Sequence, residues 1–211
     1  MLARVRISVP DRPGSLGLVT SAVGRVAANI DQVHVLETEG GRALDDVFVS
    51  VRDRVHLQSL CDELHAVTGV RVIGVQSPAP PATGYAELQL LAQVLDQPDR
   101  ALQTLLDGAP GALGADWGAL VDYGGDGGTG VLVAGTDAWP GAAAVRLTAP
   151  LRLSTPRVTG PEDRVYGGTA LVPLGQHPTG LLLVRDQGPE FHRTELWRLE
   201  QLGRVVGRAV P

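Results

Sequence analysis

Ile7-Ser8-Val9-Pro10-Asp11-Arg12-Pro13-Gly14-Ser15-Leu16 is the stretch that decides the fold of the first part of this 211-residue chain. At its start, apolar residues alternate with polar ones, which predicts a strand with one buried face. The Pro-Gly pair ends that strand, because proline suits a first helical position and glycine permits a tight turn. After it, the apolar residues adopt helical spacing. The stretch therefore predicts a strand, a glycine corner and a helix.

The corner is also a candidate binding site. The first N–H groups of a helix have no partner within the helix, so those of Gly14, Ser15 and Leu16 suit a carboxylate or a phosphate. In the plainer alternative, Pro-Gly is only a turn and Asp11 a local cap. These residues alone leave both interpretations open.

The elements that follow complete a βαββαβ order within the first 76 residues. They are strands at residues 32–38, 44–51 and 70–75, with a hairpin turn at residues 39–42 and a helix at residues 57–67. This order is ferredoxin-like, with two helices on one sheet face. In the third strand, Val47, Val49 and Val51 are predicted to face inward, and Asp46 and Ser50 outward.

The second face of this predicted sheet carries Arg4, Arg6 and Ser8. This face is either open to solvent or paired with a second copy of the chain.

Residues 1–76 resemble an ACT domain, a small regulatory module that binds amino acids in many metabolic enzymes. The resemblance rests on the Asp-Arg-Pro-Gly corner, on Ala28-Asn29-Ile30 and on the βαββαβ order. It implies that a ligand carboxylate binds the N–H groups of Gly14, Ser15 and Leu16, while Asp11 pairs with the ammonium. The Asn29 amide would bridge the two, from the same chain or from a partner, since the family places its ligand at a subunit interface. A homodimer is expected.

Residues 77–84 contain three prolines without periodicity, which predicts a linker and a domain boundary. Residues 85–211 form the second half, with helical spacing at both ends and strands between. The glycine-rich residues 124–130 are not followed by a Lys-Ser/Thr pair and open no helix, so we interpret them as a hairpin turn rather than a phosphate loop.

The second half resembles a GAF domain, a relative of PAS with a central antiparallel sheet and flanking helices. The resemblance rests on the strand pair at residues 170–174 and 180–184, on Pro189-Glu190-Phe191 and on the leucine-rich end of the chain. The whole chain is therefore predicted to be α+β, with an ACT domain followed by a GAF-like domain. The terminal helix is expected to offer a contact to a second copy through an apolar stripe made of Leu196, Leu199, Leu202 and Val206.

Composition narrows the function. The net charge is −5 and neither half has a basic excess, which argues against nucleic-acid binding. All 18 basic residues are arginine, so Schiff-base chemistry and a P-loop lysine are excluded. Cys61 is the only cysteine, and the five histidines show no ligand spacing, so no disulfide, metal site or cofactor is expected. No apolar run is long enough to span a bilayer and no signal peptide opens the chain, which predicts a cytoplasmic protein without a membrane partner.

These features predict a non-catalytic regulatory or sensor protein whose ACT domain binds a small metabolite, an amino acid above all. One alternative is a ligand-free adaptor that dimerises and docks an unknown regulated protein. A second is an enzyme that uses the GAF-like pocket, although no catalytic residues stand out and no Gly-x-Ser-x-Gly elbow is present.

Overall fold

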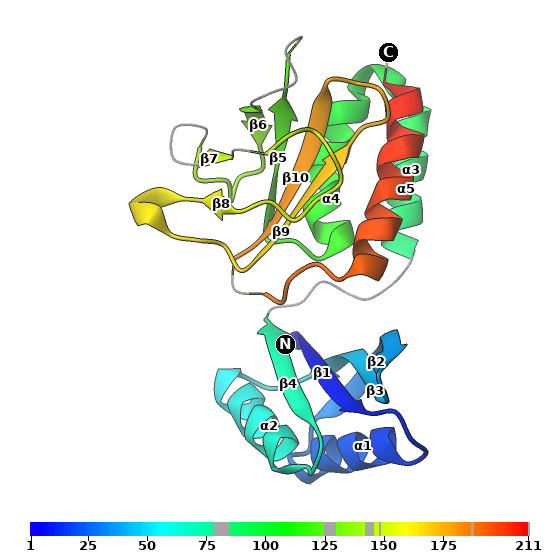
Figure 1. The fold of residues 1–211 in the computed structure, drawn as a ribbon, viewed down its shortest axis with the longest axis vertical. Coiled ribbons are helices and arrows are strands. Elements are labelled where there is room, and N and C mark those ends of the chain that lie inside the picture. The colour runs from blue at the N-terminus through cyan, green and yellow to red at the C-terminus, as the bar shows by residue number, and fades with distance from the viewer. Residues whose placement is uncertain (78–84, 125–129, 142–145, 148, 187, 211) are drawn as a thin grey trace. The chain divides into compact units, whose positions relative to one another are not determined.

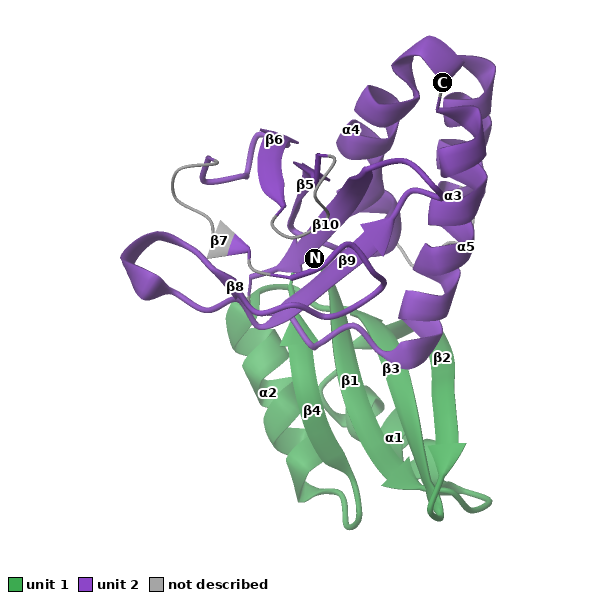
Figure 2. Cartoon of the chain, turned by 45° about the horizontal axis from the view of Figure 1, so that its top comes forward, with its two compact units in different colours: residues 1–82 green, residues 83–211 purple. Residues whose placement is uncertain are grey.

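The computed structural model describes residues 1–77, 85–124, 130–141, 146–147, 149–186 and 188–210. The chain divides into two compact units, Met1–Ala82 and Thr83–Pro211 (Figure 2). The predicted linker lies almost wholly outside the described residues, as does most of the predicted glycine hairpin, residues 125–129. Each unit contains an antiparallel four-stranded sheet, and the predicted α+β class is confirmed (Figure 1).

The first unit has the predicted βαββαβ order. Its elements are β1 (Leu2–Pro10), α1 (Ser15–Arg25), β2 (Asn29–Glu39), β3 (Arg42–Ser50), α2 (Arg54–Ala66) and β4 (Arg71–Gln76). The sheet order is β2-β3-β1-β4, so β1 is central and β2 is an edge strand. Alternate residues of β1 and β3 pack with both helices in one core around Ile7, Val47 and Leu60. The strand alternation read from the sequence is therefore the one that forms the core.

The second unit places helices on one face of its sheet. Its elements are α3 (Tyr85–Asp96), η1 (Pro98–Arg100), α4 (Ala101–Leu113), β5 (Trp117–Asp122), β6 (Val131–Gly135), β7 (Arg146–Leu147), β8 (Val158–Thr159), η3 (Pro161–Asp163), β9 (Gly168–Pro173), β10 (Thr179–Arg185) and α5 (Arg193–Ala209). The sheet order is β6-β5-β10-β9. Figure 1 shows α3, α4 and α5 together on one side of this sheet. The opposite face carries an aromatic cluster with Trp117, Tyr123 and Tyr166.

α4 continues through Pro110 and is followed by a left-handed Gly114. One prediction for the second unit is wrong. The stripe expected to contact a second copy is not available, because it faces the core of its own unit. Leu199, Leu202 and Val206 are buried there, and Leu196 packs against the same cluster. This packing on the sheet corrects the proposed helix–helix contact.

Candidate functional site

The corner between β1 and α1 is built by backbone hydrogen bonds and one glycine. The Asp11 N–H donates to the Gly41 carbonyl at 2.9 Å, which ties the corner to the β2–β3 hairpin. Gly14 stands at the N-cap of α1 with a φ of 89°, a left-handed conformation that favours glycine. No side chain caps this end of the helix. The start of α1 is thus a positive helix end with no side-chain acceptor at its cap position.

The predicted site residues of the corner lie at or beside this helix start. Asp11 and Leu16 are exposed. Ser15, in contrast, is buried, and its N–H donates to the Arg12 carbonyl at 3.2 Å, inside the turn. A ligand would therefore compete with the Arg12 carbonyl for the Ser15 N–H, and ligand binding by Ser15 stays a prediction.

Asn29 lies at the opposite end of the first unit. It is the first residue of β2 and pairs with Ser50, as does Leu2, whereas Pro10 pairs with Arg42 near the corner. The eight-residue step along β1 from position 2 to position 10 spans about 26 Å at roughly 3.3 Å per residue. Asn29 therefore cannot complete the corner of its own chain, because the strand separates the two.

Asp45, which sequence analysis did not single out, is a fully buried carboxyl group of the first unit. It lies in β3 opposite Ile7 of β1 and Val35 of β2. Neither of its carboxyl oxygens has a hydrogen-bond partner among the described residues. Burial, and then the charges of Asp46 and Asp11, raise the pKa of Asp45 above its ordinary value of 3.8. The signal was present in the sequence, because strict alternation from Val47 and Val49 puts residue 45 on the core face.

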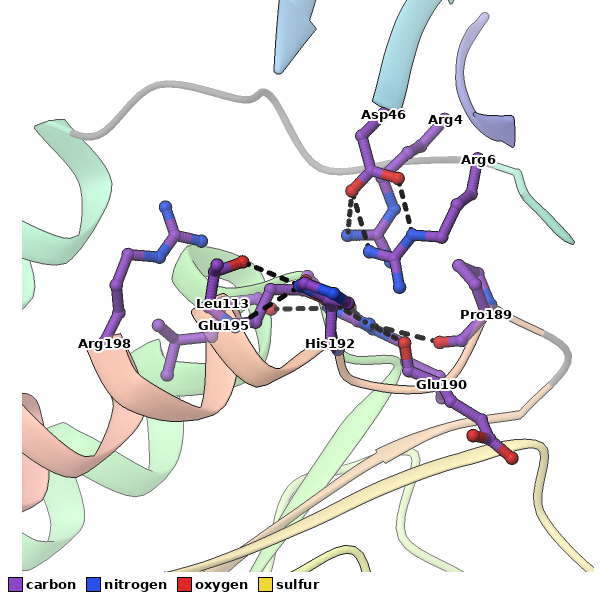
Figure 3. A network of polar contacts seen from close by, with 12 residues as sticks. Arg4, Arg6, Asp46, Leu113, Pro189, Glu190, His192, Glu195 and Arg198 are labelled. Atoms are coloured by element: carbon purple, nitrogen blue, oxygen red, sulfur yellow. Dashed lines mark hydrogen bonds and ion pairs between the residues drawn. The ribbon is translucent and has the colours of Figure 1, made fainter. Parts of the chain in front are cut away.

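Asp46, the next residue, points to the second face of the sheet, as predicted, but it is buried rather than solvated. The guanidinium of Arg6 holds it through two hydrogen bonds, at 2.7 and 2.8 Å (Figure 3). Arg4 lies 3.8 Å from the same carboxylate. Arginine forks match carboxylates in this bidentate geometry. Of the adjacent acids, Asp46 therefore has a counter-charge, whereas the Asp45 carboxyl has no hydrogen-bond partner within the described residues.

A shallow groove lies at the end of the sheet that bears the β2–β3 hairpin. It has a volume of about 300 Å³ and includes Glu37, Glu39 and Arg42 in its lining. The Arg42 guanidinium donates to the Ser8 hydroxyl and to the Gly69 carbonyl, both at 2.8 Å. Arg42 therefore fastens the hairpin to β1 and to the end of α2.

The buried polar residues of the second unit form a network that holds its elements together. Arg185 is fully buried and donates to Glu195 at 2.7 Å and to the carbonyl of Gly114 at 2.7 Å. Its guanidinium also lies 3.7 Å from the centre of the Phe191 ring. Glu195 accepts the N–H of His192 at 2.9 Å and so closes a capping box at the start of α5 (Figure 3). These contacts join the ends of α4, β10 and α5.

The first unit is, by its strand order and helix placement, a ferredoxin-like domain with a glycine corner. Residues 2–74 match the family model described as the ACT domain. The prediction of an ACT domain at the start of the chain is therefore confirmed. A search of curated proteins gave no match.

Solved structures similar to this chain include both predicted kinds of domain. The ACT domain of GTP pyrophosphokinase from Chlorobium tepidum is 25% identical, with 36% of this chain and 95% of that chain covered and a TM-score of 0.31. The GAF domain of an Acinetobacter phosphoenolpyruvate-protein phosphotransferase is 12% identical, with 58% and 91% covered and a TM-score of 0.44. The regulatory subunit of aspartate kinase from Thermus thermophilus is 20% identical, with 44% and 70% covered and a TM-score of 0.30.

No helix within the described part of the chain is long and apolar enough to cross a membrane.

Proposed function

We propose that this chain is a regulatory protein whose first unit binds a free amino acid at the β1–α1 corner. The observation that carries this proposal is the N-terminus of α1, which has Gly14 at its cap position and no side-chain cap. The exposed carboxylate of Asp11 precedes it in the same corner. A helix N-terminus attracts a carboxylate, and an aspartate attracts an ammonium group. An α-amino acid carries both groups on adjacent atoms, so one small molecule satisfies both ends of the corner.

The proposed site is completed by a second copy of the chain. β2 is an edge strand, and Val35 of β2 and Leu18 of α1 are 57% and 49% exposed. Antiparallel pairing of two β2 strands about His34 covers this apolar edge. It also brings Asn29 of the partner subunit to the Glu39 end of β2, where the Gly41 carbonyl meets Asp11. Asn29 would then serve the corner across the interface.

The test of this proposal is a thermal-shift screen with the twenty amino acids, followed by calorimetry on the strongest ligand. A ligand that binds only the folded state raises its melting temperature. Asp11→Ala removes an exposed side chain and leaves the backbone bond to Gly41 in place, so the fold is expected to persist. Loss of a charged hydrogen bond, about 1–3 kcal/mol, weakens binding by roughly 10- to 100-fold.

The matched control ligand is the hydroxy acid that corresponds to the best amino acid. It keeps the carboxylate and lacks the ammonium, so its weaker binding should be insensitive to Asp11→Ala. Equal binding of the amino acid to both proteins would refute the role of Asp11. Recovery of the ligand unchanged after long incubation, measured by mass spectrometry, is expected because the proposed role is regulation without turnover.

A ligand-free adaptor is the second candidate, and an exposed apolar surface of the second unit favours it. Leu88 and Leu95 of α3 are 64% and 51% exposed, and Trp197 of α5 is 63% exposed. Exposed aromatic and leucine side chains on neighbouring helices are typical of protein contacts. The adaptor predicts no thermal shift with any amino acid and a stable dimer by light scattering.

A further inference from the structure

The helices α3 and α5 of the second unit lie side by side (Figure 1), and both present apolar side chains to solvent. Leu88 and Leu95 of α3 are exposed, as are Trp197 and Val205 of α5. Single exposed apolar residues are ordinary on a protein surface, but several large ones gathered on adjacent helices indicate a contact surface. The corner of the first unit uses none of these residues.

The side chains form one stripe on each helix. In α3, Leu88, Ala92 and Leu95 follow one another by four and three residues, which is the spacing of one helix face. The α5 stripe has the same spacing and consists of Trp197, Gln201, Arg204, Val205 and Arg208. A carboxylate oxygen of Glu87 lies 3.6 Å from a guanidinium nitrogen of Arg198. Because these two residues precede Leu88 and follow Trp197, the stripes adjoin, and we call them together the α3–α5 surface.

The charge of the α3–α5 surface is positive. Its charged members are Arg204 and Arg208, and both are exposed. Glu200, an acid that borders the α5 stripe, is half-buried. Asp96 follows Glu87 by nine residues, or two and a half turns, so it lies on the side of α3 that faces away from α5. A positive, apolar surface on a chain with a net charge of −5 favours an acidic partner.

We propose that the α3–α5 surface docks an amphipathic helix of a partner protein, with large apolar anchors on one face and acids beside them. A third helix packs its side chains at i, i+3, i+4 and i+7 between the ridges of two adjacent helices. Tryptophan and arginine are the residue types that contribute most to such contacts. The acids of the partner would pair with Arg204 and Arg208. This inference goes beyond the proposed regulatory function and does not require that the first unit bind a ligand.

A second copy of the chain fits the α3–α5 surface less well than an acidic helix does. A two-fold contact places the same surface on both sides, so Arg204 and Arg208 of one copy would meet the positive surface of the other. Like charges brought together at an interface oppose association. Glu87 does not offset them, because it is already engaged by Arg198 of its own unit.

The experiment is fluorescence anisotropy with the full chain and labelled synthetic peptides that share leucines at helical a and d positions. One peptide carries glutamates beside the leucines, a second carries lysines there, and a third is the glutamate peptide with a proline in its middle. The glutamate peptide should bind at least about tenfold more tightly than the lysine peptide, and higher salt should narrow the difference. The proline peptide should also bind at least about tenfold more weakly, because proline breaks the helix.

Two variants with matched controls locate the contact. Trp197→Ser removes an exposed side chain and should weaken binding of the glutamate peptide by about tenfold or more, whereas Val133→Ser, on the exposed side of β6, should not. Arg204→Glu with Arg208→Glu should reverse the preference, so that the lysine peptide binds more tightly. The control for this double variant changes the charge equally at two other exposed arginines of the second unit, Arg152→Glu with Arg157→Glu, and should keep the preference of wild type.

The outcomes decide between occupants of the surface. Equal binding of the glutamate and lysine peptides, or no binding of the glutamate peptide at about 1 mM, overturns the proposal. Light scattering that shows a dimer of wild type and a monomer of Trp197→Ser also overturns it, because a second copy then covers the surface. The peptide comparison uses wild-type protein alone, so it remains decisive if a variant does not fold. Amino-acid binding is measured separately by thermal shift, so failure of either proposal leaves the other standing.

Discussion

Removing the carboxylate of Glu195 should strongly lower the free energy of unfolding of the second unit, because Glu195 supplies the counter-charge to the buried guanidinium of Arg185. Arg185 has no exposed surface, and Glu195 accepts two of its N–H groups, at 2.7 and 3.4 Å. Glu195→Ala also removes the acceptor for the His192 N–H at the start of α5. Breaking a buried pair on one side typically costs 3–5 kcal/mol, roughly, and loss of a cap costs about 1 kcal/mol.

The two losses share one carboxylate and are not additive, so we expect a decrease of about 3–5 kcal/mol in the free energy of unfolding. A domain of this size is stable by roughly 5–15 kcal/mol, so the loss is a large fraction of the total. Glu195→Gln keeps the shape of the side chain and one acceptor oxygen, so its decrease in the free energy of unfolding should be smaller. Replacing Arg185 and Glu195 together by apolar residues should recover part of the loss, because no buried charge remains.

Guanidinium unfolding followed by tryptophan fluorescence isolates the effect. All three tryptophans, at positions 117, 139 and 197, belong to the second unit, so their signal does not report on the first. Arg198→Ala is the matched control, because it breaks a 3.6 Å ion pair with Glu87 on the exposed side of the same helix. Exposed pairs contribute less than about 1 kcal/mol. If Glu195→Ala cost no more than Arg198→Ala, the buried pair would not be what holds α4, β10 and α5 together.

Two further predictions concern the effect of a single substitution on the stability of each unit. Asp45→Asn should stabilise the first unit at neutral pH, and the gain should grow as pH rises from 3.8. The reason is that the raised pKa of Asp45 makes the folded state the stronger proton binder in that range, so the contribution of Asp45 to stability falls with rising pH. Calorimetric unfolding of both proteins across pH checks it, and a stability difference between them that did not change with pH would contradict it. Gly207→Ala should destabilise the second unit by about 1–3 kcal/mol, since a Cβ at that site lies 2.3 Å from the Leu174 backbone. Gly111→Ala, which meets open space in α4, should be neutral or stabilising by up to about 1 kcal/mol in the same fluorescence assay.

Local sequence patterns were sufficient to predict the fold of the first unit, because apolar and polar residues alternate along β1. Val5, Ile7 and Val9 face the helices, and the Pro-Gly corner begins α1 where the sequence indicates. The corner was also found from sequence, since proline and glycine act through their own backbone preferences. The hydrogen bond that takes the Ser15 N–H is a property of the turn's geometry, and residue type does not reveal it.

Contacts between distant residues explain what the sequence did not show. Arg185 follows an apolar strand and would be read as its solvent-exposed end. Its acceptor on Gly114 lies 71 residues away along the chain, so only the fold brings the two together. In the same way, the leucines of α5 form a stripe that fits a partner helix or a sheet equally well. The sheet of its own unit covers them, and that choice depends on where β9 and β10 run.

The adjacent residues Asp45 and Asp46 differ in surroundings that the sequence pattern alone does not reveal. Alternation sends one carboxyl to each face of the sheet, and arginines of β1 meet only the second. A valine at position 45 would continue the pattern of Val47 and Val49 and would pack against Ile7 without an unpaired charge. The carboxyl therefore lowers the stability of the free unit and gains no hydrogen bond within its described part. Burial, and then the charges of Asp46 and Asp11, raise the pKa of this carboxyl in the folded unit.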